Sequence, residues 1–164
     1  MNPELEQQIR SAFAGVTLGD GIGLWEAKSL DDYADDITRS QARARDIRDD
    51  WSRIPAEDLP GWTAQTAMIF TDPEGLRFLL PVFLIKVADS DFPLSHLTNL
   101  SDLEKRFCYL NTAQRLVVQA YLLDYIAEAY QPEEELNLRD QRTLRRIRRA
   151  IDEYWSRPAT QENE

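Results

Sequence analysis

The chain has 164 residues, of which 43% are hydrophobic and 29% charged, with four Trp, six Tyr and six Phe. This length suits one domain with one hydrophobic core, and so much bulky apolar material excludes a wholly disordered chain. The single cysteine, Cys108, excludes an internal disulfide framework and a multi-cysteine zinc site, while the net charge of −10 argues against nucleic acid as a partner.

No export or membrane segment is evident. The start, Met1 to Glu6, has neither a basic region nor an apolar run, and no stretch approaches the roughly 20 apolar residues that cross a bilayer. Together with the lone cysteine, this predicts a cytoplasmic protein that does not associate with membranes.

The first third of the chain alternates short helical patterns with glycine-rich and proline-rich turns. Asn2 and Pro3 are typical of a helix start, and apolar residues follow at spacings of three and four. Similar spacing continues in later segments, so that helices are predicted at 4–16, 24–35 and 38–51. The last of these has an apolar stripe from Ile37 to Trp51. A short strand is one option near Ala67 to Phe70.

The centre of the chain is its most apolar part. Residues 71–74 read Thr-Asp-Pro-Glu, a strong helix start, and residues 76–85 are apolar on nearly every side apart from Arg77. This segment is predicted to be buried, with Pro81 kinking it or starting a second helix. A buried Arg77 would need an acidic partner, from Asp72, Glu74 or the pair Asp31 and Asp32.

The last part of the chain predicts a loop at 89–99, which holds the only histidine, His96, and then three helices. One follows Ser101. The next starts at Thr112 or Asn111 and has apolar residues on more than one face, so it should be central. The last covers about 138–155. The fold predicted is all-α, or α-rich with at most one short strand pair: a compact single domain of six or seven helices over 1–157, with a polar tail at 158–164.

Two segments carry a recognisable pattern. One runs from Glu26 to Pro55, and the other, from Phe70 to Leu84, contains Asp-Pro-Glu-Gly followed by Arg-Phe-Leu-Leu-Pro. They resemble a family of small bacterial domains of unknown function, over about Ser11 to Tyr130 and without the arginine-rich end. The resemblance implies a bacterial, cytoplasmic protein with a compact α-rich fold, and it implies no activity, cofactor or catalytic residue.

Clustered carboxylates are the sharpest candidate for chemistry. Residues three apart share a helical face, and two such pairs follow each other: Asp32 and Asp35, Asp46 and Asp49. Paired helices could direct four oxygens at one Mg²⁺ or Mn²⁺, as in helical pyrophosphatases. Interleaved arginines would instead neutralise these acids without a metal. A solvated, salt-bridged face with no cofactor is therefore the favoured interpretation.

The only strongly basic stretch lies in the last predicted helix. Its arginines stand opposite Leu144 and Ile147, close to an i, i+3, i+4, i+7 stripe: Arg142, Arg145, Arg146 and Arg149. Such a stripe could bind a partner protein or another anion, since guanidinium groups suit carboxylates and phosphates. The favoured alternative is internal, with the helix lying against acidic helices and neutralising them. Cys108 and His96 could form a catalytic pair, but neither stands in a nucleophile motif, and a small buried cysteine is favoured.

These observations do not define a function. The favoured hypothesis is a non-catalytic protein-interaction or accessory domain with an unidentified protein partner, for instance an immunity-type inhibitor of a basic toxin, because acidic charge speeds the capture of a basic partner. The alternative is a divalent-metal-dependent phosphohydrolase that uses Asp32, Asp35, Asp46 and Asp49. The oligomeric state stays open.

Overall fold

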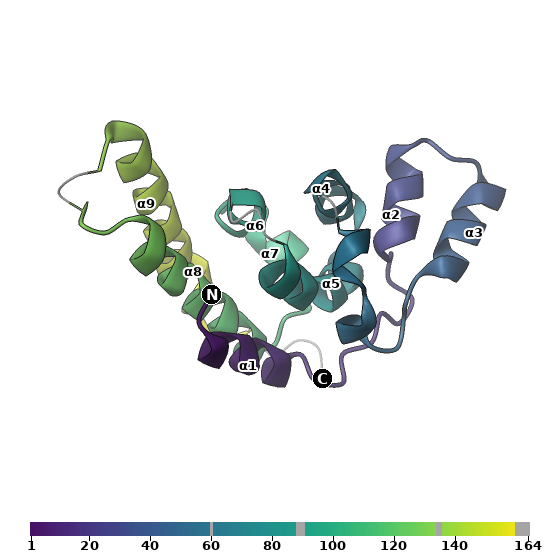
Figure 1. Cartoon of the computed structure of the whole chain (residues 1–164), viewed down its shortest axis with the longest axis horizontal. Coiled ribbons are helices and arrows are strands. Elements are labelled where there is room, and N and C mark those ends of the chain that lie inside the picture. Colours follow the sequence, from purple (N-terminus) through teal and green to yellow (C-terminus); the bar gives the residue numbers. More distant parts are fainter. Residues whose placement is uncertain (60, 88–90, 134–135, 160–164) are drawn as a thin grey trace. The chain divides into compact units, whose positions relative to one another are not determined.

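The computed structural model describes residues 1–59, 61–87, 91–133 and 136–159, and within these ranges every regular element is helical (Figure 1). This confirms the predicted all-α fold. No helix in the described ranges is both long and apolar enough to cross a membrane. Residues 160–164 of the predicted tail lie outside the described residues.

The chain forms two compact units. Residues 13–93 make up the central unit, while residues 1–12 and 94–164 together make up the terminal unit. The prediction of a single domain over 1–157 stays a prediction, and each unit is taken by itself below.

The described residues of the central unit form four α-helices and two short 3₁₀ turns. In chain order these are α2 (Leu24–Asp31), α3 (Asp36–Arg45), the turns Trp51–Arg53 and Ala56–Asp58, α4 (Gly61–Phe70) and α5 (Pro73–Lys86). Helix α2 packs against both α3 and α4. The apolar core of this unit lies along α5.

Helix α5 starts as its sequence predicts. Asp72 Oδ1 accepts a hydrogen bond from Gly75 N at 2.9 Å, with Pro73 in the first turn. Residues 78–84 are all buried, which confirms that this apolar segment is sealed from solvent. Pro81 lies inside α5, which continues to Lys86, so no second helix begins there.

Two predictions for the central unit are wrong. The strand option at 67–70 fails because residues 61–70 form helix α4, whose small residues Ala64 and Ala67 are buried with Met68 at helical spacing, while the bulky Ile69 is exposed. The helix predicted at 38–51 ends at Arg45, and α3 buries no residue. Ile37 is 71% exposed.

The terminal unit is built around one long helix. Its elements are α1 (Pro3–Ala12), α7 (Leu103–Arg106), α8 (Thr112–Ala129), α9 (Leu138–Ala150) and a π-helical turn at Ile151–Trp155, and it also receives the end of α6 (Asp91–Leu97). Because α6 is a helix, the predicted loop at 89–99 is wrong for residues 91–97, and residues 88–90 lie outside the described residues. Asn111, rather than Thr112, caps α8, through a capping box with Gln114.

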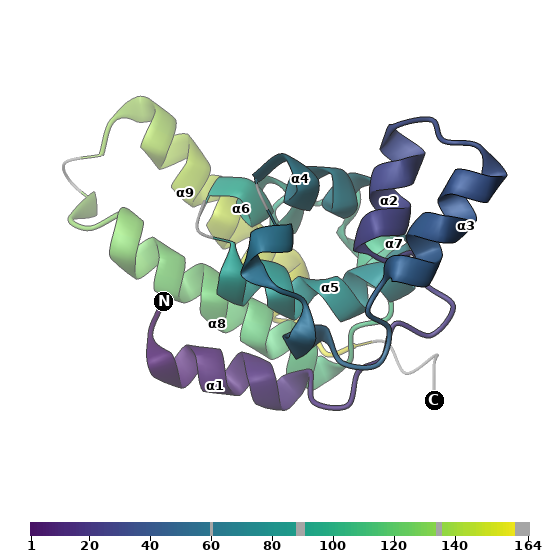
Figure 2. The same ribbon diagram turned by 45° about the vertical axis from the view of Figure 1, so that its right-hand side comes forward.

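Helix α1 lies antiparallel to α8. The amino group of Met1 is 3.5 Å from Glu128, near the end of α8, whereas Ala12 O accepts a hydrogen bond from Gln114 Nε2 at 3.3 Å, near its start. Figure 2 shows the two helices side by side. Leu5 and Ile9 of α1 are buried, so the first helix contributes to the core of the terminal unit.

Aromatic packing closes that core at the end of the chain. Trp155 is fully buried, its ring centroid is 5.3 Å from that of Phe107, and its Nε1 donates to Leu97 O at 2.8 Å. This satisfied indole fixes the last turn of the chain against the segments that carry α6 and α7.

Candidate functional site

The four aspartates of the metal hypothesis serve four separate structural roles. Asp32 pairs with Lys28 at 2.5 Å, and Asp49 pairs with Arg53 at 2.6 Å. Asp35 accepts a hydrogen bond from Thr38 N at 2.8 Å and so caps α3, and this hydrogen bond lowers the pKa of Asp35. The structure does not gather them. Among the described residues, no three His, Cys, Asp or Glu side chains are placed to hold a metal ion.

Asp46 is the buried member of the set. Its carboxylate, 8% exposed, accepts hydrogen bonds from Trp25 N at 2.7 Å and from Glu26 N at 3.2 Å. These amides belong to the first turn of α2, where Gly23 has no side chain to act as a cap. Burial raises the pKa of Asp46, and the two amide hydrogen bonds oppose that rise.

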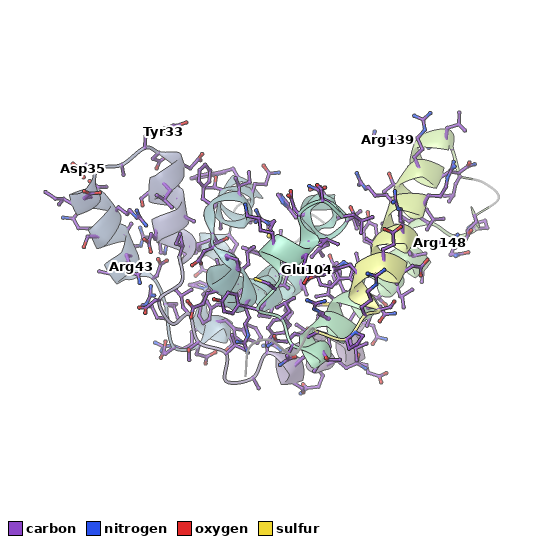
Figure 3. The ribbon with its side chains drawn as sticks, turned by 180° about the vertical axis from the view of Figure 1, so that it is seen from behind. Tyr33, Asp35, Arg43, Glu104, Arg139 and Arg148 are labelled. Carbon is purple, nitrogen blue, oxygen red and sulfur yellow. The ribbon has the colours of Figure 1, made fainter. Side chains whose placement is uncertain are left out.

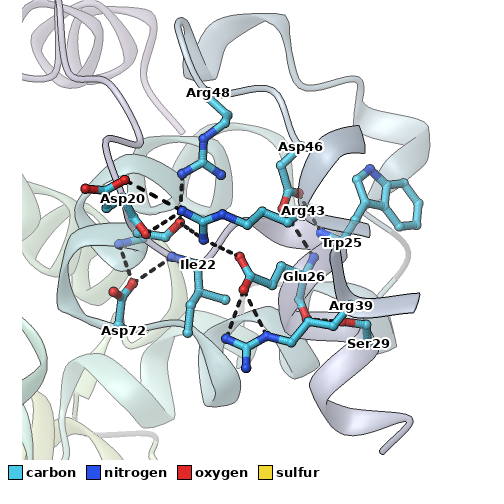
Figure 4. Close-up of polar contacts among 12 residues, drawn as sticks. Asp20, Ile22, Trp25, Glu26, Ser29, Arg39, Arg43, Asp46, Arg48 and Asp72 are labelled. Atoms are coloured by element: carbon cyan, nitrogen blue, oxygen red, sulfur yellow. Dashed lines mark hydrogen bonds and ion pairs between the residues drawn. The ribbon is translucent and has the colours of Figure 1, made fainter. Parts of the chain in front are cut away.

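A second buried acid, Glu26, is held by two arginines from α3. Its side chain is 2% exposed, with Oε1 accepting from Arg39 Nε at 3.0 Å and Oε2 accepting from Arg43 Nη1 at 2.7 Å (Figure 4). The hydrogen bond to Glu26 also raises the pKa of Arg43. Two of the interleaved arginines therefore join α3 to α2 instead of neutralising the predicted aspartates.

The glycine loop before α2 is fixed by polar contacts and close packing. Arg48 donates to Gly21 O at 3.2 Å, and Ile22 N donates to Asp72 Oδ1 at 3.0 Å (Figure 4). A Cβ built on Gly75 would stand only 2.1 Å from Ile22 O, so the loop touches the first turn of α5. Asp72 thus accepts hydrogen bonds from both the loop and the first turn of α5, and so holds these two segments together.

Three single-residue expectations are corrected. Cys108 is exposed, not buried. Arg77 is half-buried and forms no ion pair with any of the four acids predicted to hold it; its Nε has no hydrogen-bond partner in the described ranges. His96 lies on α6, where burial, followed by the nearby Arg106 charge, lowers its pKa.

The arginines of α9 are on the solvent side of their helix. Leu144, Ile147 and Ala150 are buried, whereas the arginine face is exposed: Arg139, Arg142, Arg145, Arg146, Arg148 and Arg149. Figure 3 shows Arg139 and Arg148 projecting from this helix. Among the described residues, acidic side chains pair with Arg148 and Arg149 only, and the favoured interpretation, in which this helix neutralises acidic helices, stays a prediction.

Only part of the arginine face is neutralised. Arg148 pairs with Glu133, and Arg149 pairs with Glu153 at 2.6 Å. Arg145 Nε donates to the backbone oxygen of Gln141 at 3.3 Å. The remaining three, Arg139, Arg142 and Arg146, form no ion pair with any described residue, and their spacing of three and four places them on one stripe.

The comparisons with known proteins identify a family and nothing more specific. No curated protein and no solved structure matches the chain. The model of one protein family matches residues 1–159. The match includes α9, so the arginine-rich end lies inside the family rather than beyond it. The chain therefore belongs to a family of unknown function, DUF6714.

Proposed function

We propose that this chain is a non-catalytic protein-binding domain whose α9 arginines contact an acidic surface of a partner protein. The observation that supports the proposal is the exposed arginine face of α9 on a chain with a net charge of −10. Acids outnumber bases in this chain, yet four of the six arginines, namely Arg139, Arg142, Arg145 and Arg146, have no acidic partner among the described residues.

The geometry of the face suits carboxylates. A guanidinium group offers several N–H donors in a planar fork and can bind a carboxylate through two of them. Arg142 and Arg146 are one helical turn apart, with Arg139 a further turn back, so their side chains form a continuous row. An acidic helix or loop laid along this row would meet one guanidinium group per turn.

A protein partner is favoured over nucleic acid by the charge of the rest of the chain. The affinity of a protein for a phosphate backbone rises with each nearby cationic side chain and falls with each nearby anionic one. In this chain acids outnumber bases by 29 to 19. A protein surface with a local cluster of acids needs only the local row of arginines.

The narrower form of the proposal is an accessory or immunity-type role in a bacterial cytoplasm. There the acidic surplus of the whole chain would speed encounter with a basic toxin, while the arginine row would contact an acidic patch on it.

The proposal is tested by photo-crosslinking in the native cell. A benzophenone amino acid at Leu138, which is 70% exposed and one turn before Arg142, should give one crosslinked protein product. The variant carrying Arg142→Glu and Arg146→Glu should lose it, because charge reversal repels an acidic partner. The matched control places the crosslinker at Tyr33, 95% exposed in the central unit.

Two results would overturn this assignment. One is a crosslinked product that persists in the charge-reversed variant. The other is a salt-sensitive gel shift of duplex or single-stranded DNA that the same two substitutions abolish, because this would make the row a phosphate-binding surface.

A further inference from the structure

Helix α8 exposes an apolar stripe on a face predicted to be central. Leu116 and Leu123 are each 50% exposed, although bulky aliphatic side chains are normally buried. They are seven residues apart and alternate with small residues at the same helical face: Ala113, Ala120 and Ala127. This is the spacing of residues that pack against a second helix, here over two repeats.

Helix α1 forms one wall beside this stripe. A groove of about 580 Å³ runs between the two helices, lined on α8 by Ala113, Leu116 and Val117 and on α1 by Glu4, Gln8 and Ser11, among others. All of these residues belong to the terminal unit. Leu116 lines the groove, and the exposed Leu123 continues the stripe seven residues further along α8. The alanines beside them leave room for another backbone to approach closely.

The charges beside the stripe have one sign. Glu4 lines the groove, and Asp124 and Glu128 follow the stripe along α8. Glu128 pairs with the Met1 amino group at 3.5 Å, whereas Glu4 and Asp124 have no ion pair among the described residues. No described residue that lines the groove is basic. A second copy of the chain would place acids against acids, so self-association is disfavoured.

We propose that the groove between α1 and α8 binds an amphipathic helix of another protein, with aliphatic residues on its inner face and lysine or arginine on its flanks. This site is independent of the α9 arginines in both residues and chemistry, so either proposal can fail without the other. The exposed stripe spans fifteen residues from 113 to 127, or about 21 Å of helix. Four turns of a partner helix would cover it, with i, i+3, i+4 and i+7 residues as anchors.

The test uses a synthetic helical peptide as the probe. An 18-residue fluorescein-labelled peptide, with leucine at two positions of each heptad and lysine on both flanks, is titrated with the chain and followed by fluorescence anisotropy. We expect saturable binding, and at least about tenfold weaker binding when the flanking lysines are replaced by glutamate.

Variants of the chain separate the groove from nonspecific attraction. Leu116→Glu and Leu123→Glu should each weaken binding of the lysine peptide by at least about tenfold, since each removes an apolar anchor from the stripe. The milder Leu123→Gln, checked by its melting temperature, guards against loss of folding. The matched control is Ile37→Glu, which alters an exposed residue of the central unit and should change the affinity less than about twofold.

Three outcomes would overturn the proposal. The first is no binding of the lysine peptide to the unmodified chain. The second is binding that the leucine variants leave intact. The third is a homodimer, seen by light scattering, that Leu123→Glu dissociates, because the stripe would then be covered by a second copy of the chain.

Discussion

The carboxylate of Asp46 lies where a side chain at residue 23 would stand, because a Cβ built on Gly23 would be 2.3 Å from Asp46 Cγ. Gly23 has φ of −84°, which any residue can adopt, so its role is steric and not conformational. Asp46 in turn supplies the cap that Gly23 cannot, which couples the two positions energetically.

The coupling predicts a non-additive double-mutant cycle. Gly23→Ala should displace the Asp46 carboxylate and lower the free energy of unfolding by about 1–2 kcal/mol, comparable to the loss of a helix cap. Asp46→Ala should have an effect of similar size. In the Asp46→Ala background, Gly23→Ala should cost less than about 0.5 kcal/mol, because there is nothing left to displace. Urea denaturation measures all four proteins, and simple additivity would contradict the cap.

Glu26 and Asp49 provide a contrast between a buried and an exposed ion pair. Glu26→Gln removes a charge that two arginines surround, and should lower the free energy of unfolding by about 1–3 kcal/mol, discounted because both arginines are partly exposed. Asp49→Asn breaks a surface pair, for which about 0–1 kcal/mol is typical. Chemical denaturation of the two variants measures both changes. Equal losses of unfolding free energy would show that Glu26 does not hold α2 and α3 together.

His96 should make stability fall on mild acidification. Its pKa is lowered in the folded chain, so the unfolded chain binds the proton more readily. The stability that the neutral imidazole contributes is present above the unfolded pKa of about 6.5 and is lost as the pH falls through the lower, folded pKa. The melting temperature of the unmodified chain should therefore drop more between pH 7.5 and 5.5 than that of His96→Gln. Parallel curves would contradict this assignment.

Divalent metal should leave the chain unaffected. A site with a Kd of about 0.1 mM would, at 5 mM Mg²⁺ or Mn²⁺, stabilise the folded chain by about 2 kcal/mol and raise the melting temperature by several degrees. Because the four aspartates serve separate helix caps and ion pairs, we expect a change of less than about 1 °C. A rise of several degrees that Asp46→Asn abolishes would restore the metal hypothesis.

Two adjacent leucines on α8 test which face of that helix is buried. Leu122 is fully buried and Leu123 is 50% exposed. Leu122→Ala should lower the free energy of unfolding by about 2–5 kcal/mol, because it leaves a cavity. Leu123→Ala should cost about 1 kcal/mol or less, because water already reaches this side chain. Similar losses would mean that the stripe is covered within the folded chain.

Local signals were enough to predict the starts of α1 and α5, but not that of α7, where Asp102 rather than Ser101 is the N-terminal cap residue. Asn2 accepts a hydrogen bond from Glu4 N at 2.9 Å, and Asp72 caps α5, as the residue types at these positions predict. Each signal involves residues two or three apart. The helical class of the fold and the burial of the α5 segment followed from the same kind of local pattern.

Predictions that depended on the surroundings of a residue failed. Leu116 and Leu123 belong to a helix whose composition is typical of a protein core. Their exposure, however, depends on which segments pack against α8, and α1 covers a different side of that helix. The two acids that the structure buries bind groups that are distant in the chain. Glu26 accepts a hydrogen bond from Arg39, 13 residues away, and Asp46 accepts one from Trp25 N, 21 residues away. No sequence spacing distinguishes them from the exposed Asp32 and Asp49.

The antiparallel pairing of α1 with α8 sets an order of events during synthesis. The hydrogen bond from Gln114 to Ala12 joins residues 102 positions apart. At about 5–20 residues per second, the first helix therefore waits on the order of 5–20 s after leaving the ribosome before its packing partner exists. The contiguous residues 13–93 emerge within that interval. Leu5 and Ile9, which are buried in the folded chain, therefore lack α8 as a packing partner during this interval.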